Sequence, residues 1–178
     1  MNPKNTLCLI VDIQERLLPA LSGADEMLEH CRLLIKGLTA LDIPFAVTEQ
    51  YPKGLGNTVS AVSLLLPEGT PVVEKTRFSA FLPEIQEILR KNDIKHVILV
   101  GAEAHICMLQ TALDLKAQGY AVSLPFECTA SRTTANRDNG LAQMSRQGIT
   151  VSNVESILFQ LLGDAKHPAF KTISELIQ

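Results

Sequence analysis

The sequence has no apolar run of the roughly 18 residues that a membrane-spanning helix needs. It also has little net charge, −3 over 178 residues, which gives no electrostatic reason for binding nucleic acid or an anionic membrane. The first residues lack the long apolar region and the small-residue cleavage site of a secretory signal. These absences predict a cytoplasmic protein with neither nucleic acid nor a membrane as a partner.

Cysteine is scarce, and its spacing argues against two kinds of site. The four cysteines are Cys8, Cys31, Cys107 and Cys128. None forms a C-x-x-C pair, so a redox motif or a cysteine zinc site is not expected. His105 has no second histidine at metal-ligand spacing. The sequence therefore predicts no metal and no cofactor, and a role for Cys107 has to be weighed against four free thiols that simply pack in the interior.

Short β-branched runs alternate with helical periodicity along the chain. Six strands are predicted, at residues 6–12, 43–49, 70–75, 95–101, 119–124 and 148–152. Apolar strands separated by helices indicate a parallel sheet covered on both faces, and right-handed crossovers make this a three-layer α/β/α sandwich. The length suits one domain, expected to span residues 1–178. The irregular connection 49–70 is a candidate wall of a site.

Polar residues follow several of these strands, and ligands of such sheets bind outside the carboxyl ends of the strands. Asp12 ends the first strand, Lys75 ends the third, and Cys107 follows the fourth. A thiolate is a nucleophile, a carboxylate can move its proton, and an ammonium lowers a thiol pKa. Each residue also has a structural interpretation, since Asp12 can cap a turn and Lys75 can be a solvated charge.

The segment before Cys107 could add hydrogen-bond donors to this group. Backbone N–H groups of residues 103–107 would face the same place and could stabilise a developing oxyanion. Glu103 and His105 could equally be ordinary residues of a first helical turn, where a carboxylate meets the helix dipole favourably.

Three motifs, "LIVDIQ", "VEKTRFSAF" and "LVGAEAHICMLQTALDL", with the weaker "ASR" at 130–132, resemble the isochorismatase-like hydrolase superfamily, also called cysteine hydrolases. The resemblance covers nearly the whole chain. It implies a Rossmann-like, six-stranded parallel sheet of order 3-2-1-4-5-6, which places Asp12 beside Cys107. It further implies an Asp–Lys–Cys triad at Asp12, Lys75 and Cys107, an oxyanion site at the N–H groups of Glu103 and Cys107, and a cis peptide bond before Glu103.

Two further segments, "VTEQYPKGLG" (47–56) and "GDAKHPAFK" (163–171), resemble the isochorismatase domain-containing protein 2 branch. Nicotinamidases, which are similar over the triad, carry an Asp-x-His metal motif after the second strand. Glu49-Gln50-Tyr51 stands at that place, so no bound metal is expected. Isochorismatases that cleave a vinyl ether generally lack the cysteine, and Cys107 therefore disfavours that chemistry. The resemblance also implies a homo-oligomer.

Together these observations favour hydrolysis of a small-molecule substrate at an amide or amide-like C–N bond through a thioester. Cys107 would attack the carbonyl and Asp12 would carry the proton, while Lys75 keeps Asp12 ionised and the thiol acidic. The candidate substrate-binding residues are Gln14, Glu49, Tyr51 and Phe78. Three alternatives remain open: a thiol-based sensor, a catalytically silent binding or scaffold protein on the same fold, and a vinyl ether hydrolase.

Overall fold

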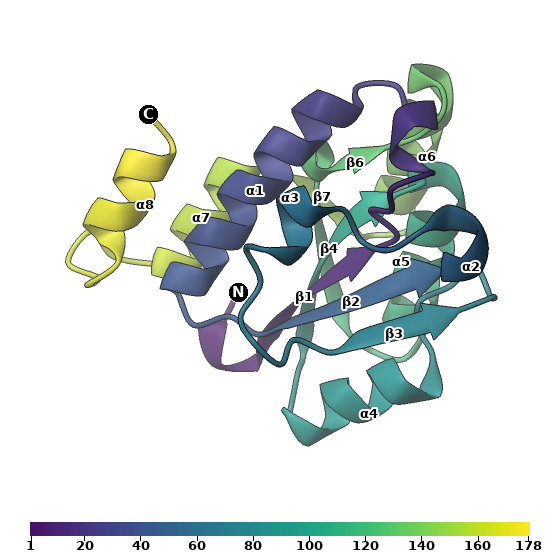
Figure 1. Cartoon of the computed structure of the whole chain (residues 1–178). Coiled ribbons are helices and arrows are strands. Elements are labelled where there is room, and N and C mark those ends of the chain that lie inside the picture. The colour runs from purple at the N-terminus through teal and green to yellow at the C-terminus, as the bar shows by residue number, and fades with distance from the viewer.

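The computed structural model describes residues 1–178 and has a parallel sheet between two layers of helices (Figure 1). Its strands are β1 (Thr6–Val11), β2 (Phe45–Gln50), β3 (Val72–Lys75), β4 (His96–Ala102), β5 (Ala121–Pro125), β6 (Thr129–Ala130) and β7 (Thr150–Ser152). They are ordered β3-β2-β1-β4-β5-β7, with β6 beside β4, and every pair is parallel. The predicted α/β sandwich and the order 3-2-1-4-5-6 are confirmed, with β7 as the sixth predicted strand.

The chain also has eight α-helices and four other helical turns. The helices are α1 (Ala24–Ala40), α2 (Pro52–Leu55), α3 (Ser60–Ser63), α4 (Pro83–Lys91), α5 (Leu109–Ala117), α6 (Thr134–Arg146), α7 (Val154–Leu162) and α8 (Phe170–Leu176). The turns are η1 (Pro3–Asn5), η2 (Leu18–Ala20), η4 (Phe126–Cys128), all of the 3-10 type, and the π-helical turn η3 (Ala104–Met108). None of the helices is both long and apolar enough to cross a membrane.

The central strand β1 shows why the sheet has a core on each face. Cys8 and Ile10 pack in a cluster with residues of α1 and α7, whereas Leu7 and Leu9 pack in a second cluster with residues of α4 and α5. Alternate side chains of a strand point to opposite faces, so a strand that is apolar throughout needs helices on both sides. Figure 1 shows α1 and α7 on one side of the sheet and α4 on the other.

The two-residue strand β6 was not predicted, because so short a segment carries no periodicity. It places Thr129 opposite Gly101 and Ala130 opposite Ala102 at the carboxyl end of β4. Gly101 has a φ of +127°, and a Cβ atom there would lie 1.9 Å from the carbonyl oxygen of Val11. The close approach of β4 to β1 therefore depends on glycine at this position, directly before the segment that carries Cys107.

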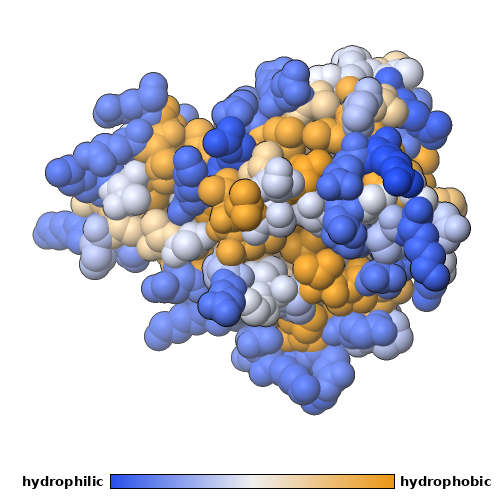
Figure 2. All heavy atoms as spheres, in the orientation of Figure 1, coloured by the Kyte–Doolittle hydropathy of each residue, from blue (hydrophilic) through white to orange (hydrophobic).

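The open edge of the sheet is formed by β3, whose first residue, Val72, is 54% exposed. The face of the molecule drawn in Figure 2 has apolar surface interrupted by charged and polar side chains. Since β3 pairs only with β2, one edge of β3 has no strand beside it.

Candidate active site

Asp12, Lys75 and Cys107 meet at the carboxyl end of the sheet, as their positions after β1, in β3 and after β4 predicted. The Lys75 Nζ atom lies 2.6 Å from Asp12 Oδ2 and 3.7 Å from Cys107 Sγ. All three residues are buried, with exposed fractions of 0%, 4% and 7% for Asp12, Lys75 and Cys107. Because β2 lies between β1 and β3, the long lysine side chain reaches across one strand to make the ion pair.

Asp12 is fixed by β2 as well as by Lys75. Its φ of 55° is left-handed, a conformation that a short polar side chain tolerates. Its backbone N–H donates to the Thr48 carbonyl at 3.1 Å, and the Thr48 hydroxyl donates to Asp12 Oδ1 at 3.0 Å. Oδ1 and Oδ2 therefore have different partners, and the orientation of the carboxylate is set.

The Lys75 ammonium has more acceptors around it than its three N–H groups can serve. Besides Asp12, it donates to Gln50 Oε1 at 2.7 Å and to the carbonyl oxygens of Phe78 at 3.0 Å and Arg77 at 3.2 Å. A buried charge is tolerated when it is paired and hydrogen-bonded. The sulfur of Cys107 is the most distant of these neighbours, so the ammonium is committed mainly to oxygen atoms.

The structure contradicts the expectation of an acidic Cys107 thiol. Burial, followed by the negative charge of Asp12, raises the pKa of Cys107 to about 12, against an opposing effect of Lys75. Burial also raises the pKa of Asp12, although Lys75 lowers it in part. The physical reason is that Asp12 and Lys75 already neutralise each other, so a thiolate would add an uncompensated negative charge to a buried site. Burial and the charge of Asp12 therefore favour the neutral thiol of Cys107 over its thiolate.

The turn that carries Cys107 begins at a cis peptide bond between Ala102 and Glu103, as the family resemblance implied. The Glu103 N–H has no backbone acceptor in the chain. The Glu103 carboxylate accepts hydrogen bonds from the backbone N–H of Arg132 at 2.9 Å and from its Nε at 3.2 Å. Ser131 adds a hydrogen bond between its hydroxyl and His105 Nδ1 at 3.1 Å. The "ASR" segment thus holds the turn before Cys107 in place.

Two of the predicted substrate-binding residues, Gln14 and Glu49, make hydrogen bonds that hold the β2–β3 connection. Gln14 Nε2 donates to the carbonyls of Gly56 at 2.7 Å and Gln50 at 3.0 Å, and its Oε1 accepts the Gln50 N–H at 2.7 Å. Glu49 Oε1 accepts from the N–H and hydroxyl of Thr58 at 2.6 and 2.7 Å. Sequence gave no sign of these bonds, because their partners lie up to 42 residues away.

The other two predicted substrate-binding residues have exposed side chains, with 55% of Tyr51 and 53% of Phe78 accessible. Tyr51 lines a hollow of about 370 Å³ at the ends of β2 and β3. The other residues that line it are Pro52, Lys53, Glu74, Lys75 and Thr76. The hollow reaches Lys75 but not Cys107, so contacts of Tyr51 and Phe78 with a substrate stay predictions.

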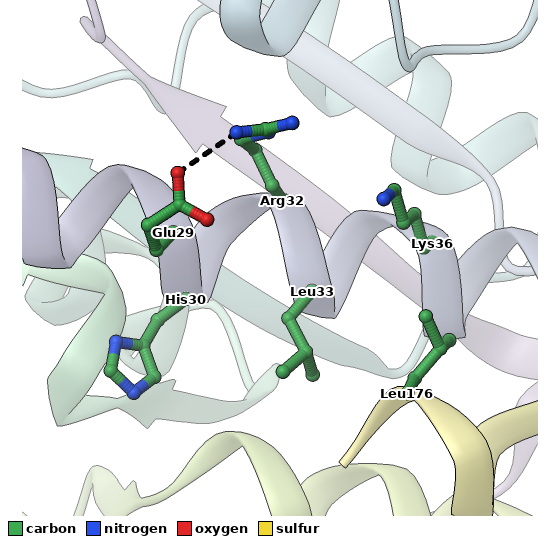
Figure 3. A pocket seen from close by; sticks show the side chains of 6 residues that line it. All are labelled: Glu29, His30, Arg32, Leu33, Lys36 and Leu176. Carbon is green, nitrogen blue, oxygen red and sulfur yellow. Dashed lines mark hydrogen bonds and ion pairs between the residues drawn. The ribbon is translucent and has the colours of Figure 1, made fainter. Parts of the chain in front are cut away.

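A second hollow, of about 260 Å³, lies between α1 and α8 and is separate from this site (Figure 3). It is lined by Glu29, His30, Arg32, Leu33, Lys36 and Leu176. Glu29 and Arg32 form an exposed ion pair at 2.8 Å, and none of the predicted site residues contributes to the lining. No group of three His, Cys, Asp or Glu side chains in the structure is arranged to hold a metal ion.

Gly140 of α6 allows the turn that carries Cys107 to lie close to this helix. A Cβ atom at Gly140 would lie 2.8 Å from the Ala104 carbonyl carbon and 2.9 Å from the His105 nitrogen. Gly140→Ala would ordinarily stabilise a helix, yet here we expect a loss of about 1–3 kcal/mol from overpacking. Urea denaturation would measure it, with the exposed Ser145→Ala in the same helix as control. A gain in stability for Gly140→Ala would show that the turn yields freely.

Comparison with known proteins identifies the family. The isochorismatase domain matches residues 6–156. The chain is 42% identical over 177 residues to isochorismatase domain-containing protein 1 of Salmo salar, covering 99% of this chain and 62% of that relative. It is 32% identical to isochorismatase domain-containing protein 2 of Xenopus laevis, covering 99% of this chain and 85% of the relative. The chain thus spans less than two thirds of the Salmo salar protein.

Solved structures with the same fold support this family assignment. A Caenorhabditis elegans protein described as MAR1 ribonuclease superimposes with a TM-score of 0.95 at 38% identity, over 99% of this chain and 91% of that chain. The Escherichia coli YcaC gene product, described as an octameric hydrolase of unknown specificity, has a TM-score of 0.92 over 99% of this chain and 88% of that one; at 18% identity it shows the shared fold only. The predicted resemblance is confirmed, and the chain belongs to the isochorismatase domain family.

Proposed function

We propose that this chain is a cysteine-dependent hydrolase of a small amide or amide-like C–N bond. Members of the family are generally hydrolases. The observation that supports the proposal is the buried contact of one ammonium with both a carboxylate, at 2.6 Å, and a thiol, at 3.7 Å. Nucleophile and base lie together in a buried site, an arrangement suited to acyl transfer.

Because burial raises the pKa of Cys107, the proposed step removes its proton as the bond to carbon forms. The Sγ–C bond forms, the carbonyl π pair moves to oxygen, and the thiol proton passes to Asp12. The Asp12 pKa is itself raised by burial, which makes the carboxylate a stronger base. Since Asp12 becomes neutral in this step, the negative charge moves to the carbonyl oxygen, where the N–H groups of Glu103 and Cys107 would receive it.

The second half of the reaction reverses these proton movements. As the C–N bond breaks, the protonated Asp12 returns its proton to the leaving amine, and a thioester remains on Cys107. A water molecule then attacks the thioester through its oxygen atom, and Asp12, again a carboxylate, takes a proton from that water. The S–C bond breaks and the thiol recovers the proton. Lys75 stays protonated throughout and holds Asp12 in place.

The thioester is the species that tests this function. We expect intact-mass spectrometry, after incubation with a panel of small aliphatic and aromatic amides, to detect an acyl adduct that peptide mapping places on Cys107. Cys107→Ser should show no thioester, and Cys8→Ser, with its sulfur in the core, is the matched control that keeps the adduct. A substrate hydrolysed at an unchanged rate by Cys107→Ala would contradict the proposal.

The same assay separates the alternatives. Peroxide-sensitive oxidation of Cys107 without any acyl adduct would favour a thiol sensor, and cleavage of a vinyl ether by Cys107→Ala would favour isochorismatase chemistry. Because the Caenorhabditis elegans relative is described as a ribonuclease, labelled RNA belongs in the panel. The net charge of −3 gives no overall electrostatic attraction to a phosphate backbone, so no cleavage is expected. A homo-oligomer, in keeping with the octameric Escherichia coli relative, and a cytoplasmic location stay predictions.

A further inference from the structure

Thr111 of α5 joins the two segments that carry Cys107 and Lys75. Its hydroxyl donates to the Cys107 carbonyl at 2.6 Å and accepts the Ala80 N–H at 2.8 Å. A hydroxyl has one proton, and a backbone N–H can only donate, so both roles are assigned without ambiguity. Thr111 and Ala80 are completely buried. Both bonds are therefore shielded from water.

The bond to Ala80 reaches a segment that also holds the ammonium. The Phe78 carbonyl, two residues before Ala80, accepts from Lys75 Nζ at 3.0 Å. The contact of Lys75 Nζ with Cys107 Sγ at 3.7 Å closes a ring that runs from the sulfur through the ammonium, residues 78–80 and the Thr111 hydroxyl back to Cys107. The contacts of this ring together hold the Cys107 sulfur and the Lys75 ammonium at their distance from each other.

A threonine in a helix often donates to the carbonyl four residues earlier, as Thr111 does to Cys107, and that bond alone would be local. The bond from Ala80 is not local, since it spans 31 residues. Ala80 lies in the connection between β3 and α4, so this hydrogen bond joins α5 to that connection. Thr111 therefore connects two elements, whereas a threonine bonded only within its helix would not.

We propose that Thr111 is a positioning residue that holds Cys107 at its working distance from Lys75 and Asp12. The proposal rests on the hydrolase function, because that distance matters only if the sulfur reacts. Without the hydroxyl, the Ala80 N–H and the Cys107 carbonyl each lose a buried partner. The turn and the β3–α4 connection then separate, and Cys107 becomes more exposed.

The test compares Thr111→Val, which removes the hydroxyl at nearly constant shape, with Thr111→Ser, which keeps it. The rate at which iodoacetamide alkylates Cys107 is followed against pH by peptide mapping, which needs no substrate. Exposure lowers the pKa of a buried thiol, so Thr111→Val should be alkylated about tenfold faster near pH 8, as for one pKa unit. Thr111→Ser should follow the wild type, and turnover should fall only in Thr111→Val.

An unchanged alkylation profile in a folded Thr111→Val protein, even one that melts earlier, would overturn the proposal and leave Thr111 a purely structural residue. If Thr111→Val does not fold, Thr111→Ala decides, because alanine removes the hydroxyl without adding a methyl group and favours helix. Failure of the hydrolase function would be recognised separately, as the absence of any acyl adduct on the wild-type protein.

Discussion

Asp12→Asn should raise the reactivity of Cys107 toward iodoacetamide while nearly abolishing hydrolysis. The negative charge of Asp12 is the second-largest cause of the raised Cys107 pKa, and asparagine removes it. The ammonium of Lys75 then lacks its carboxylate, and a thiolate becomes its natural counter-ion. We expect alkylation near pH 8 to rise at least about tenfold. Turnover should fall by about 10²–10⁴-fold, the usual contribution of a positioned base.

Asparagine is the suitable replacement because it keeps the structure around the carboxylate. It tolerates the left-handed backbone that Asp12 adopts, and its carbonyl oxygen can still accept the Thr48 hydroxyl. The double variant Asp12→Asn/Lys75→Met is the control, and it should lose the gain in alkylation because no ammonium remains. Slower alkylation of Asp12→Asn than of the wild type would mean that Asp12 already activates the resting thiol, and the concerted proton transfer would be wrong.

Lys75→Met should cost about 3–5 kcal/mol of folding free energy near neutral pH, the usual result of removing one partner from a buried ion pair. The side chains of Lys75 and Asp12 are both fully inaccessible, so the remaining carboxylate has no water to replace the ammonium. Urea denaturation measures the loss. Lys91→Met, which breaks an exposed pair with Glu87 at 2.8 Å, is the matched control and should change stability little.

The loss should depend on pH with a definite sign. Burial raises the Asp12 pKa, and Lys75 is the main group that lowers it, so removing Lys75 raises the folded-state pKa further. A carboxyl group with a raised folded-state pKa contributes most to stability below its unfolded pKa and loses that contribution as pH rises. The deficit of Lys75→Met relative to the wild type should therefore shrink as the pH falls from about 7 toward 5. A deficit that grows on acidification would contradict the assigned charges.

The positions of Asp12, Lys75 and Cys107 could be predicted because each follows from strand order. A parallel sheet brings the ends of its strands to one edge, and the family order puts β1 beside β4. The uninterrupted apolar sequence of β1 likewise predicted a core on both faces. These features depend on residues close together in sequence or on a topology with few alternatives.

The thiol pKa could not be predicted in the same way. The sign of the Cys107 shift depends on how completely the site is buried and on whether the nearby charges already cancel, and neither is visible in sequence. The hydrogen bonds of Gln14 and Glu49 could not be predicted for a related reason, since a polar residue near a strand end looks the same whether it faces a ligand or a loop. Thr111 lies in the motif LVGAEAHICMLQTALDL. Its hydrogen bond to Ala80 nevertheless exists only once α5 packs beside the β3–α4 connection.

The strand that supplies Lys75 has four residues and a hydrogen-bonded neighbour on one side only. Short edge strands are among the first parts of a fold to open locally. Each such opening would withdraw Lys75 and leave Asp12 without a counter-ion, so amide protons of β3 and the charge pair should share one opening equilibrium. Anything that binds the free edge of β3 would make this local opening less frequent. A contact at that edge would thereby increase the fraction of molecules in which Lys75, Asp12 and Cys107 are together.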